Sequence, residues 1–354
     1  MKITNKHNYP QTLVDAVSFD SHRTEGDISV TTLIGAPQVR YLRKKHGLEM
    51  TADVSEMMWA LFGTAVHAIL ERANISDVRR NAFMEVISTL KEHHSRYLNS
   101  ALKENETEEE AIEAQKVFKW LLSYMLKYFP EIKSRYEFEL TLHYKCRGWV
   151  VSGTLDLFDK IDGILYDYKV TSVFMYMNPE SRTSWKRQLN VYIKFLRESG
   201  YTVNGAKIVA IFRDFSRVRC ATVRGYPRKQ VMEIDIAMYE DDLITKWIDH
   251  RVNLHQQADK GIFDPCNGEE RWASAPQYAV MDPDKKRALS GSVTDSKDVA
   301  EMFIKNNQHK YKKQLYIRET PEIWRKCEQY CNVNEFCEQF KVYKKTQPED
   351  FTDV

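Results

Sequence analysis

Residues 149–170 decide the fold, and they read WVVSGTLDLFDKIDGILYDYKV. Two runs rich in β-branched and aromatic residues, 149–158 and 164–170, flank the segment Lys160-Ile161-Asp162-Gly163. The Asp-Gly pair in that segment is typical of a tight turn between antiparallel strands. The pattern therefore predicts a β-hairpin.

Three charged side chains lie on this predicted hairpin. Asp167 and Lys169 are two positions apart on one strand, so both side chains leave the same face of the sheet. Asp156 lies on the partner strand, and a turn at 160–163 brings it within a few pairing positions of Asp167. Two carboxylates and an ammonium are therefore expected in one small volume.

Two carboxylates in apolar surroundings repel each other and lose solvation unless a positive charge joins them. A hard divalent cation such as Mg²⁺ or Mn²⁺ meets that need with oxygen ligands. Lys169 beside such a metal could polarise a water molecule or neutralise charge that develops on a phosphate. A weak surface salt bridge among the same side chains is the alternative interpretation.

The period of the sequence predicts helices and strands around the hairpin. Helices are expected at 29–46, 55–73, 78–103, 108–128, 185–199 and 235–258, and further strands at 137–144, 206–212 and 220–223. This order predicts an α/β (α+β) fold, with a central mixed sheet flanked by helices. After Gly261, residues 277–289, 295–306 and 312–318 resemble a small strand-helix-strand appendage.

Composition limits the class of protein. Of the 354 residues, 43% are hydrophobic, and 52 basic residues nearly cancel 50 acidic ones, so net charge argues neither for nor against a nucleic-acid partner. No run approaches the roughly 20 apolar residues of a membrane span. We expect a cytoplasmic protein without a membrane partner, divided into 1–54, a core at 55–260, an appendage with cysteines at 261–340 and a charged tail at 341–354.

Two predicted helices carry polar residues at helical spacing. Gly63, His67 and Glu71 form one stripe at i, i+4 and i+8, and Gln188 and Tyr192 share a face at i and i+4. Taken singly, His67 is more often a half-buried histidine than a ligand, and Gln188 and Tyr192 are more often packing residues.

Three of the six cysteines, Cys327, Cys331 and Cys337, crowd into eleven residues. Three thiols at this spacing can converge on one metal ion or cluster, and a fourth ligand is needed to close a four-coordinate site. Cys146 and Cys220 lie in strand-like surroundings and are interpreted as small buried residues.

Four motifs together resemble one known family. Gly63-Thr64-Ala65-Val66-His67, Gly153-Thr154-Leu155-Asp156, Asp167-Tyr168-Lys169 and Gln188-Leu189-Asn190-Val191-Tyr192 resemble, in order and spacing, the RecB-like branch of the PD-(D/E)XK nuclease superfamily. The matched region runs from about residue 60 to 195, and the resemblance implies a restriction-endonuclease-like core. It also implies roles: His67, Asp156 and Asp167 as metal ligands, Lys169 as the catalytic lysine with the two aspartates, and Gln188 and Tyr192 as substrate-binding residues.

The resemblance extends to the cysteines, with one departure. RecB-like nucleases with an iron–sulfur centre carry three cysteines after the core and one before the His motif, where this chain has Ala36. Cys266, in a polar loop, is the best replacement for the missing ligand. A [4Fe–4S] cluster on Cys266, Cys327, Cys331 and Cys337 is therefore expected, with structural Zn²⁺ or free thiols as alternatives.

The implied function is a metal-dependent DNA nuclease, with Mg²⁺ or Mn²⁺ as cofactor. RecB-like relatives favour an exonuclease that acts on single-stranded DNA or duplex ends in recombination, repair or phage replication, in a bacterial or phage-infected cell. The sequence has no P-loop of its own, so a separate helicase or recombination protein is an expected partner. A structure-specific endonuclease and a non-catalytic nucleic-acid-binding scaffold are the alternatives.

Phosphate contacts must come from local charge. The residues expected to make them are Arg40, Arg43, Lys44, Lys45, His46, Lys186 and Arg187.

Overall fold

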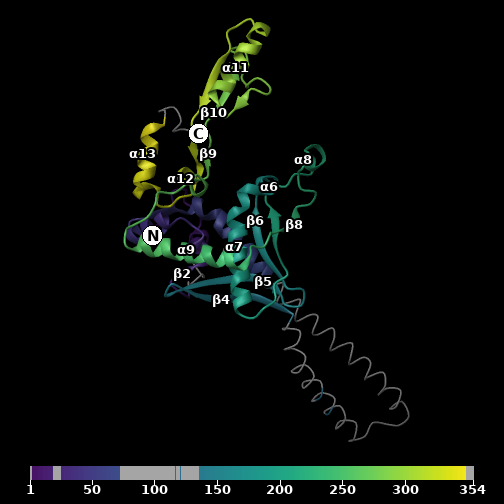
Figure 1. Ribbon diagram of the computed structural model, residues 1–354, viewed down its shortest axis with the longest axis vertical. Helices are drawn as coiled ribbons and strands as arrows, with labels where there is room; N and C mark the ends of the chain where they lie inside the picture. The colour runs from purple at the N-terminus through teal and green to yellow at the C-terminus, as the bar shows by residue number, and fades with distance from the viewer. Residues whose placement is uncertain (1, 19–24, 72–115, 117–119, 121–134, 348–354) are drawn as a thin grey trace, which may run out of the picture. The chain divides into compact units, whose positions relative to one another are not determined.

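The computed structural model describes residues 2–18, 25–71, 116, 120 and 135–347, and these form two compact units (Figure 1). The sheet unit comprises Asn5–Ile34 and Asp53–Asn253, and the cysteine unit comprises Met1–Thr4, Gly35–Ala52 and Leu254–Val354. The helices predicted at 78–103 and 108–128 lie outside the described residues. In the described part of the chain, no helix is both long enough and apolar enough to cross a membrane.

The sheet unit is built on a mixed six-stranded sheet. Its strands are β2 (Ile28–Ser29), β4 (Tyr136–Cys146), β5 (Trp149–Asp159), β6 (Ile164–Thr171), β7 (Gly205–Phe212) and β8 (Val231–Asp235). The order is β2-β5-β6-β7-β8, and β4 also pairs with β5. The neighbours β5 and β6 are antiparallel, β6 and β7 are parallel, and β7 and β8 are antiparallel. The predicted fold class and the predicted hairpin are confirmed.

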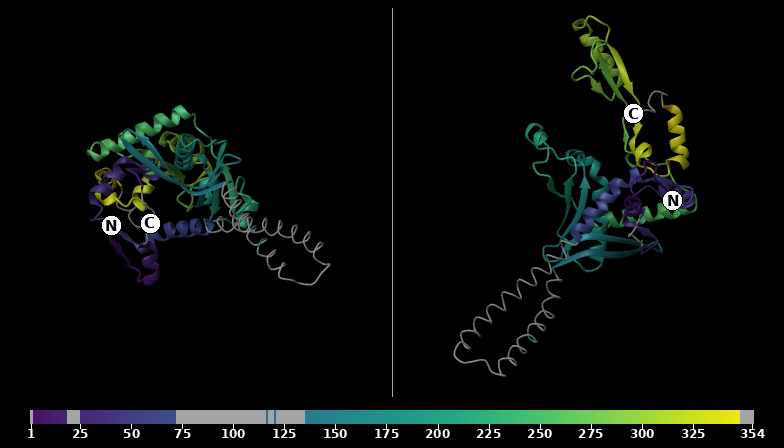
Figure 2. Two further views of the ribbon diagram at one scale, coloured as in Figure 1. Left: turned by 90° about the horizontal axis from the view of Figure 1, so that it is seen from below. Right: turned by 180° about the vertical axis from the view of Figure 1, so that it is seen from behind.

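Helices cover this sheet. The central one is α7 (Thr183–Glu198) (Figure 1). Its side chains Leu189, Ile193 and Leu196 share one buried hydrophobic cluster with Phe158 and Ile208 of the strands. Further helices in the described part of this unit include α1 (Gln11–Ser18), α2 (Val30–Leu33), a helix over 54–71, α6 (Val173–Met177), α8 (Arg217–Thr222) and most of α9 (Asp241–Asp259). Figure 2 shows the 54–71 helix, in blue-violet, beside the sheet.

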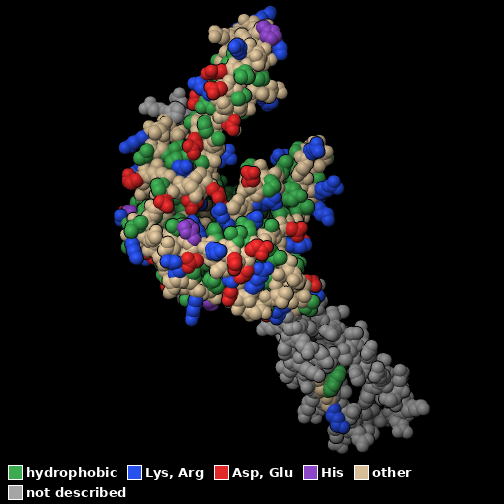
Figure 3. Space-filling model, in the orientation of Figure 1, with side chains coloured by type: hydrophobic (Ala, Val, Ile, Leu, Met, Phe, Trp, Pro, Cys, Tyr) green, Lys and Arg blue, Asp and Glu red, His purple; other side chains and the backbone are tan. Residues whose placement is uncertain are grey.

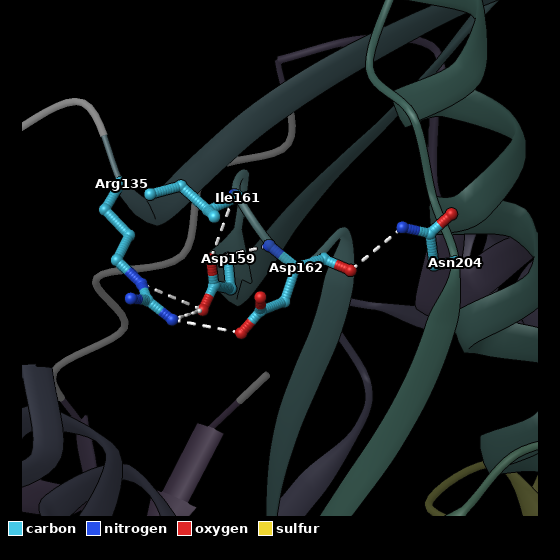
Figure 4. A network of polar contacts seen from close by, with 5 residues as sticks. All are labelled: Arg135, Asp159, Ile161, Asp162 and Asn204. Atoms are coloured by element: carbon cyan, nitrogen blue, oxygen red, sulfur yellow. Dashed lines mark hydrogen bonds and ion pairs between the residues drawn. The ribbon is translucent and has the colours of Figure 1, made fainter.

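The turn between β5 and β6 is held by a polar network (Figure 4). Asp159 accepts hydrogen bonds from the backbone N–H groups of Ile161 and Asp162, at 3.0 and 3.2 Å, and Arg135 binds both Asp159 and Asp162. Asn204 donates to the carbonyl of Asp162 at 3.0 Å and so ties the turn to the start of β7. Burial alone would raise the pKa of Asp159, but these hydrogen bonds outweigh it and lower the pKa. The hairpin therefore has a fixed register.

Some predicted elements are wrong in type or extent. The helix expected over 29–46 is two helices, α2 and α3 (Pro37–His46), because Pro37 begins a new helix and cannot continue the first. The strand expected over 220–223 is instead α8. The strand β8 was not predicted, and it takes up Asp235, so α9 begins later, at Asp241.

The cysteine unit combines short elements with a small lobe. Around α3 lie β1 (Lys2–Thr4), α10 (Gly268–Arg271), β9 (Ala273–Ser274), β13 (Ile323–Trp324), α12 (Arg325–Gln329) and α13 (Glu338–Thr346). The strand β3 (Thr51–Asp53) pairs with β1. The lobe has a three-stranded sheet of β10 (Gln277–Met281), β11 (Val293–Thr294) and β12 (Tyr316–Thr320), with α11 (Lys297–Asn307) packed on it (Figure 2). The first strand, the helix and the last strand were predicted, although the first strand is shorter than 277–289, and β11 was not predicted.

Candidate active site

The hairpin brings the three predicted charged side chains together. Lys169 Nζ lies 2.7 Å from Asp167 Oδ2 and donates a hydrogen bond to Asp167 Oδ1 at 3.0 Å. The Asp167 side chain is only 4% exposed, whereas Lys169 is 23% exposed. Although Asp167 Oδ2 is close to the ammonium, this buried oxygen accepts no hydrogen bond from any described residue. Asp167 Oδ2 therefore has the Lys169 ammonium as a close neighbour but lacks the hydrogen bond that a buried carboxylate oxygen usually accepts.

Asp156 lies where the ladder between β5 and β6 stops. The last pairs before it are Phe158 with Leu165 and Leu157 with Tyr166. At the next position Asp156 Oδ2 accepts the backbone N–H of Tyr168 at 2.7 Å, in place of a strand-to-strand hydrogen bond. A carboxylate of β5 thus contacts the backbone of β6 at the point where the ladder between the two strands has ended.

The 54–71 helix places His67 against this carboxylate. His67 Nδ1 lies 3.6 Å from Asp156 Oδ2, and the imidazole ring makes an edge-to-face contact with Tyr168 at a centroid distance of 6.4 Å. Glu71, one turn further along, lines the same cavity. The motif that contains His67 and the two hairpin motifs therefore meet, although about 90 residues separate them in sequence.

The remaining two predicted residues come from α7. Tyr192 is 3% exposed, and its hydroxyl oxygen lies 3.4 Å from Gln188 Nε2. Its ring packs on Gly153, where an added Cβ would lie 2.5 Å from Tyr192 Cε1 and 2.6 Å from Val30 Cγ2. Burial raises the pKa of Tyr192, and so do the charges of Asp167 and Asp156, so the phenol stays protonated. Gly153 is thus explained by the close approach of α7 to β5.

All these groups line one cavity of about 690 Å³. The six predicted residues that line it are His67, Asp156, Asp167, Lys169, Gln188 and Tyr192. Glu25, Glu71 and Glu139 add further carboxylates to its wall. The cavity therefore combines acidic groups from three strands, a helix and the segment before β2 with the ammonium of Lys169.

Glu139 is a site residue that the sequence analysis did not assign. It lies on β4 between Phe138 and Leu140, which pair with Leu157 and Leu155, so Glu139 faces the position of Asp156. Its φ of 45° is in the left-handed region, which costs a non-glycine residue on the order of 1 kcal/mol. Burial, followed by the charges of Asp156 and Glu71, raises its pKa to about 7. The sequence signal was weak, because glutamates on strands are usually solvated.

The electrostatics of Asp156 fit a cation site. Burial, followed by the charge of Asp167, raises the pKa of Asp156 to about 6, although His67, the Tyr168 N–H and Lys169 act in the opposite direction. The positive groups present do not fully compensate two adjacent carboxylates, and a divalent ion would. In the described part of the chain, no three His, Cys, Asp or Glu side chains already stand in metal-ligand geometry. The donor chemistry fits a hard metal, and a third ligand would have to move toward it.

The cysteine unit also gathers its predicted residues. Cys266, Cys327, Cys331 and Cys337 line one small cavity of about 20 Å³. Burial raises the pKa of Cys266 to about 12, and the nearby charges of Glu270 and the other three cysteines contribute. Gln38 donates to Cys337 Sγ at 3.5 Å and accepts the backbone N–H of Cys266 at 3.0 Å. Cys146 and Cys220 lie elsewhere, in the sheet unit.

The basic residues of α3 are engaged inside the cysteine unit. Arg40 binds both oxygens of Asp259, at 2.7 and 3.2 Å, and Lys44 lies 3.3 Å from the same carboxylate. Arg43 donates to Asn332 at 2.9 Å. In the sheet unit, Lys186 lies over the ring of Tyr239. Many of the basic side chains predicted to contact phosphate therefore bind other residues of the protein instead.

A mixed sheet with a hairpin that presents two aspartates and a lysine to a cavity defines a restriction-endonuclease-like protein. A family model described as PD-(D/E)XK nuclease superfamily matches residues 38–338, so the chain belongs to that superfamily. Membership indicates a hydrolytic nuclease with DNA as its substrate class, and nucleases of this superfamily generally use Mg²⁺ or Mn²⁺.

Two further comparisons add little. A solved structure titled "Crystal structure of SSO0001" aligns with a TM-score of 0.37 and 14% identity, over 68% of this chain and 84% of that chain. A search of curated proteins found no match.

Proposed function

We propose that the chain is a metal-dependent DNA nuclease of the RecB-like branch and that it hydrolyses phosphodiester bonds from DNA ends. The observation that carries the proposal is the meeting of Asp156, Asp167 and Lys169 with His67 at one cavity. His67, Asp156 and Asp167 are the ligands that would hold Mg²⁺ or Mn²⁺. When bound, such an ion supplies Lewis acidity at the scissile phosphate and acidifies a water molecule.

The other groups act through position and charge. Lys169 is held by Asp167, so its ammonium can donate to the attacking water or to the charge that develops on the phosphate. Tyr192 stays a neutral phenol and, with Gln188, presents hydrogen-bonding groups to the substrate strand. An exonuclease is favoured over a structure-specific endonuclease by the motif resemblance, and a separate helicase or recombination protein remains a proposed partner.

Turnover of end-labelled DNA with Mn²⁺ tests this proposal. We expect wild-type protein to release short products, and we expect Lys169→Ala and Asp167→Ala each to lower the rate at least a hundredfold. Lys207→Ala is the matched control, because Lys207 lies on β7, outside the cavity, and pairs with Glu233 at 2.7 Å. A circular single strand should stay intact if the enzyme needs an end.

Two results would reject the assignment. If wild type left every strand intact, or if both variants matched it, the chain would be a non-catalytic nucleic-acid-binding scaffold. Cleavage of the circular strand would instead favour the endonuclease.

We also propose that Cys266, Cys327, Cys331 and Cys337 bind a metal centre that ties the cysteine unit together. Their convergence on one cavity supports this, since a bound cation would stabilise the thiolate forms that burial disfavours. The cysteine pattern favours a [4Fe–4S] cluster, and a single Zn²⁺ held by the same four thiolates is the alternative.

Metal analysis and a visible spectrum of anaerobically purified protein decide between these centres. About four irons per chain with absorption near 400 nm would establish the cluster, and one zinc in a colourless protein would establish the alternative. Protein with neither metal would leave free thiols and reject the proposal. Cys146→Ser, in the sheet unit, serves as the control for Cys327→Ser.

A further inference from the structure

The connection between β7 and β8 is a strongly basic projection that the proposed chemistry does not use. We call residues 213–230 the β7–β8 arm, and it includes α8. It has six cations against one carboxylate, a net charge of +5, whereas the whole chain carries +2. The cations are Arg213, Arg217, Arg219, Arg224, Arg228 and Lys229, and all are exposed. Figure 3 shows Lys and Arg side chains gathered over the α8 projection.

The base of the arm is ordered. Its one carboxylate, Asp214, accepts the backbone N–H of Val173 at 2.7 Å. Tyr226 is 5% exposed, and its hydroxyl accepts the N–H of Ser216 at 2.9 Å and donates to the carbonyl of Asp214 at 3.3 Å. Because Asp214 is used in this network, it holds the arm in place and leaves the cations to face solvent.

Among the described residues, no carboxylate pairs with the cations of the arm. None of the six forms an ion pair with a residue that the structure describes. The guanidinium of Arg213 lies 4.4 Å from the ring centroid of Trp59, and that of Arg219 lies 5.2 Å from the ring centroid of Tyr226. Ring contacts orient a guanidinium while they leave its N–H edge free for phosphate oxygens.

The arm begins beside the catalytic strand. Lys169 of β6 pairs with Ala210 of β7, and Thr171 pairs with Phe212, the residue before the arm. The three residues from Ala210 to Arg213 span about 10 Å. A duplex strand advances about 3.4 Å per nucleotide along its axis, so about three nucleotides separate the floor of the cavity from the start of the arm.

We propose that the β7–β8 arm binds the sugar–phosphate backbone of the DNA substrate, starting about three nucleotides from the scissile phosphate. The inference rests on the proposed function, since it names the part of the substrate that lies outside the cavity. Exposed arginines on an ordered loop match a polyanion of regular spacing, and no base-specific contact is needed. An acidic protein partner is the competing occupant.

Salt-dependent DNA binding tests the arm separately from catalysis. The test variant is Arg217→Gln with Arg224→Gln, because neither side chain contacts a ring or carboxylate that the structure describes. The control of equal charge change is Lys145→Gln with Lys246→Gln, two exposed lysines of β4 and α9. All proteins carry Lys169→Ala, and fluorescence anisotropy measures binding of a labelled 20-nucleotide single strand at several salt concentrations.

The expected result is a smaller salt slope in the arm variant. Loss of two phosphate contacts from a single strand should reduce the slope of log K against log salt by about 1.4, with about tenfold weaker binding, while the control stays unchanged. With Lys169 intact, the arm variant should cleave the 20-mer more slowly but cleave a dinucleotide as fast as wild type. That dependence on substrate length distinguishes loss of DNA binding outside the cavity from general damage to the fold.

The contrary outcomes are distinct. Equal salt slopes for the arm variant and the control, in a protein that cleaves DNA, would overturn the arm proposal and point to an acidic protein partner. A reduced slope in a protein that cleaves nothing would uphold the arm and reject the nuclease assignment.

Discussion

At the residue scale, Asp156 is a predicted metal ligand whose pKa departs clearly from its ordinary value. Burial and the neighbouring Asp167 raise its pKa from 3.8 to about 6. Because the folded-state pKa is raised, this carboxyl contributes stability that is fully present below a pH of about 4 and is lost as the pH rises through about 6. The metal-free protein is therefore expected to lose stability across this window.

Replacement of Asp156 by Asn should remove that loss. The pKa of Asp156 is raised by a little over two units and each unit corresponds to about 1.4 kcal/mol, so the metal-free variant should be more stable than wild type at pH 8 by about 3 kcal/mol. The difference should vanish near pH 4, and Asn can still accept the N–H of Tyr168. Urea unfolding at both pH values measures the effect; a variant less stable than wild type at pH 8 would contradict the assignment of repulsion to this site.

Gly153 links two of the motifs through packing. An added methyl group there would overlap Tyr192 and Val30, so Gly153→Ala should destabilise the protein by about 1–3 kcal/mol and displace Tyr192 from the cavity. Gly63→Ala is the control, since no atom lies within 4 Å of its Cβ position, and helix propensity should make it slightly stabilising. Urea denaturation of both variants tests the comparison, and equal stability would show that α7 does not pack tightly on β5.

At the element scale, the hairpin was predictable because its signal is local. The Asp-Gly turn and the alternating runs specify register without help from the rest of the chain. The arm was missed for the opposite reason. Residues 220–223 are short and partly apolar, so they resemble a strand, whereas capping by Ser216 and the burial of Tyr226 make the segment a helix on a projection. The cluster of basic residues from Arg213 to Lys229 was the sequence signal that could have identified the arm.

The turn itself gives a prediction about this element. Gly163 has a φ of +67°, and an added Cβ would lie 2.7 Å from Asn204 Nδ2 and 2.8 Å from the carbonyl of Thr202. Gly163→Ala should therefore cost about 2–4 kcal/mol, from the left-handed backbone and from the overlap. Gly148 has a φ of +78°, but no atom lies within 4 Å of the position of an added Cβ. Gly148→Ala should therefore lower the free energy of unfolding by only about 1 kcal/mol. Chemical denaturation measures both, and equal costs would show that contact with Asn204 does not constrain the turn.

At the scale of the whole molecule, the sequence correctly predicted which motif residues lie together. It was less successful at predicting which basic side chains have no acidic partner among the described residues. Four motifs spread over more than a hundred residues meet at one cavity, because each sits on an element with a clear period. The basic end of α3 did not reliably predict phosphate contacts. Asp259 is distant in sequence, and its pairing with Arg40 depends on tertiary structure. Glu139 was not assigned to the site because its position there depends on a left-handed backbone conformation, which no sequence pattern indicates.

The division into two units predicts how the molecule unfolds. The cysteine unit has its own small cores, and its proposed metal centre would contribute folding energy to that unit alone. Removal of the metal should lower the midpoint of one thermal transition by several degrees and leave the transition of the sheet unit in place. Calorimetry of protein before and after chelation measures this, and a single transition that does not respond to the metal would contradict it.

The central claim is that opposed carboxylates on the hairpin hold a divalent cation. Binding of Mn²⁺, followed by electron paramagnetic resonance, tests it most directly. We predict saturable binding to wild type and to Lys207→Ala, and at least tenfold weaker binding to Asp156→Asn and Asp167→Asn. Equal binding by all four proteins, or no binding by wild type, would contradict the claim.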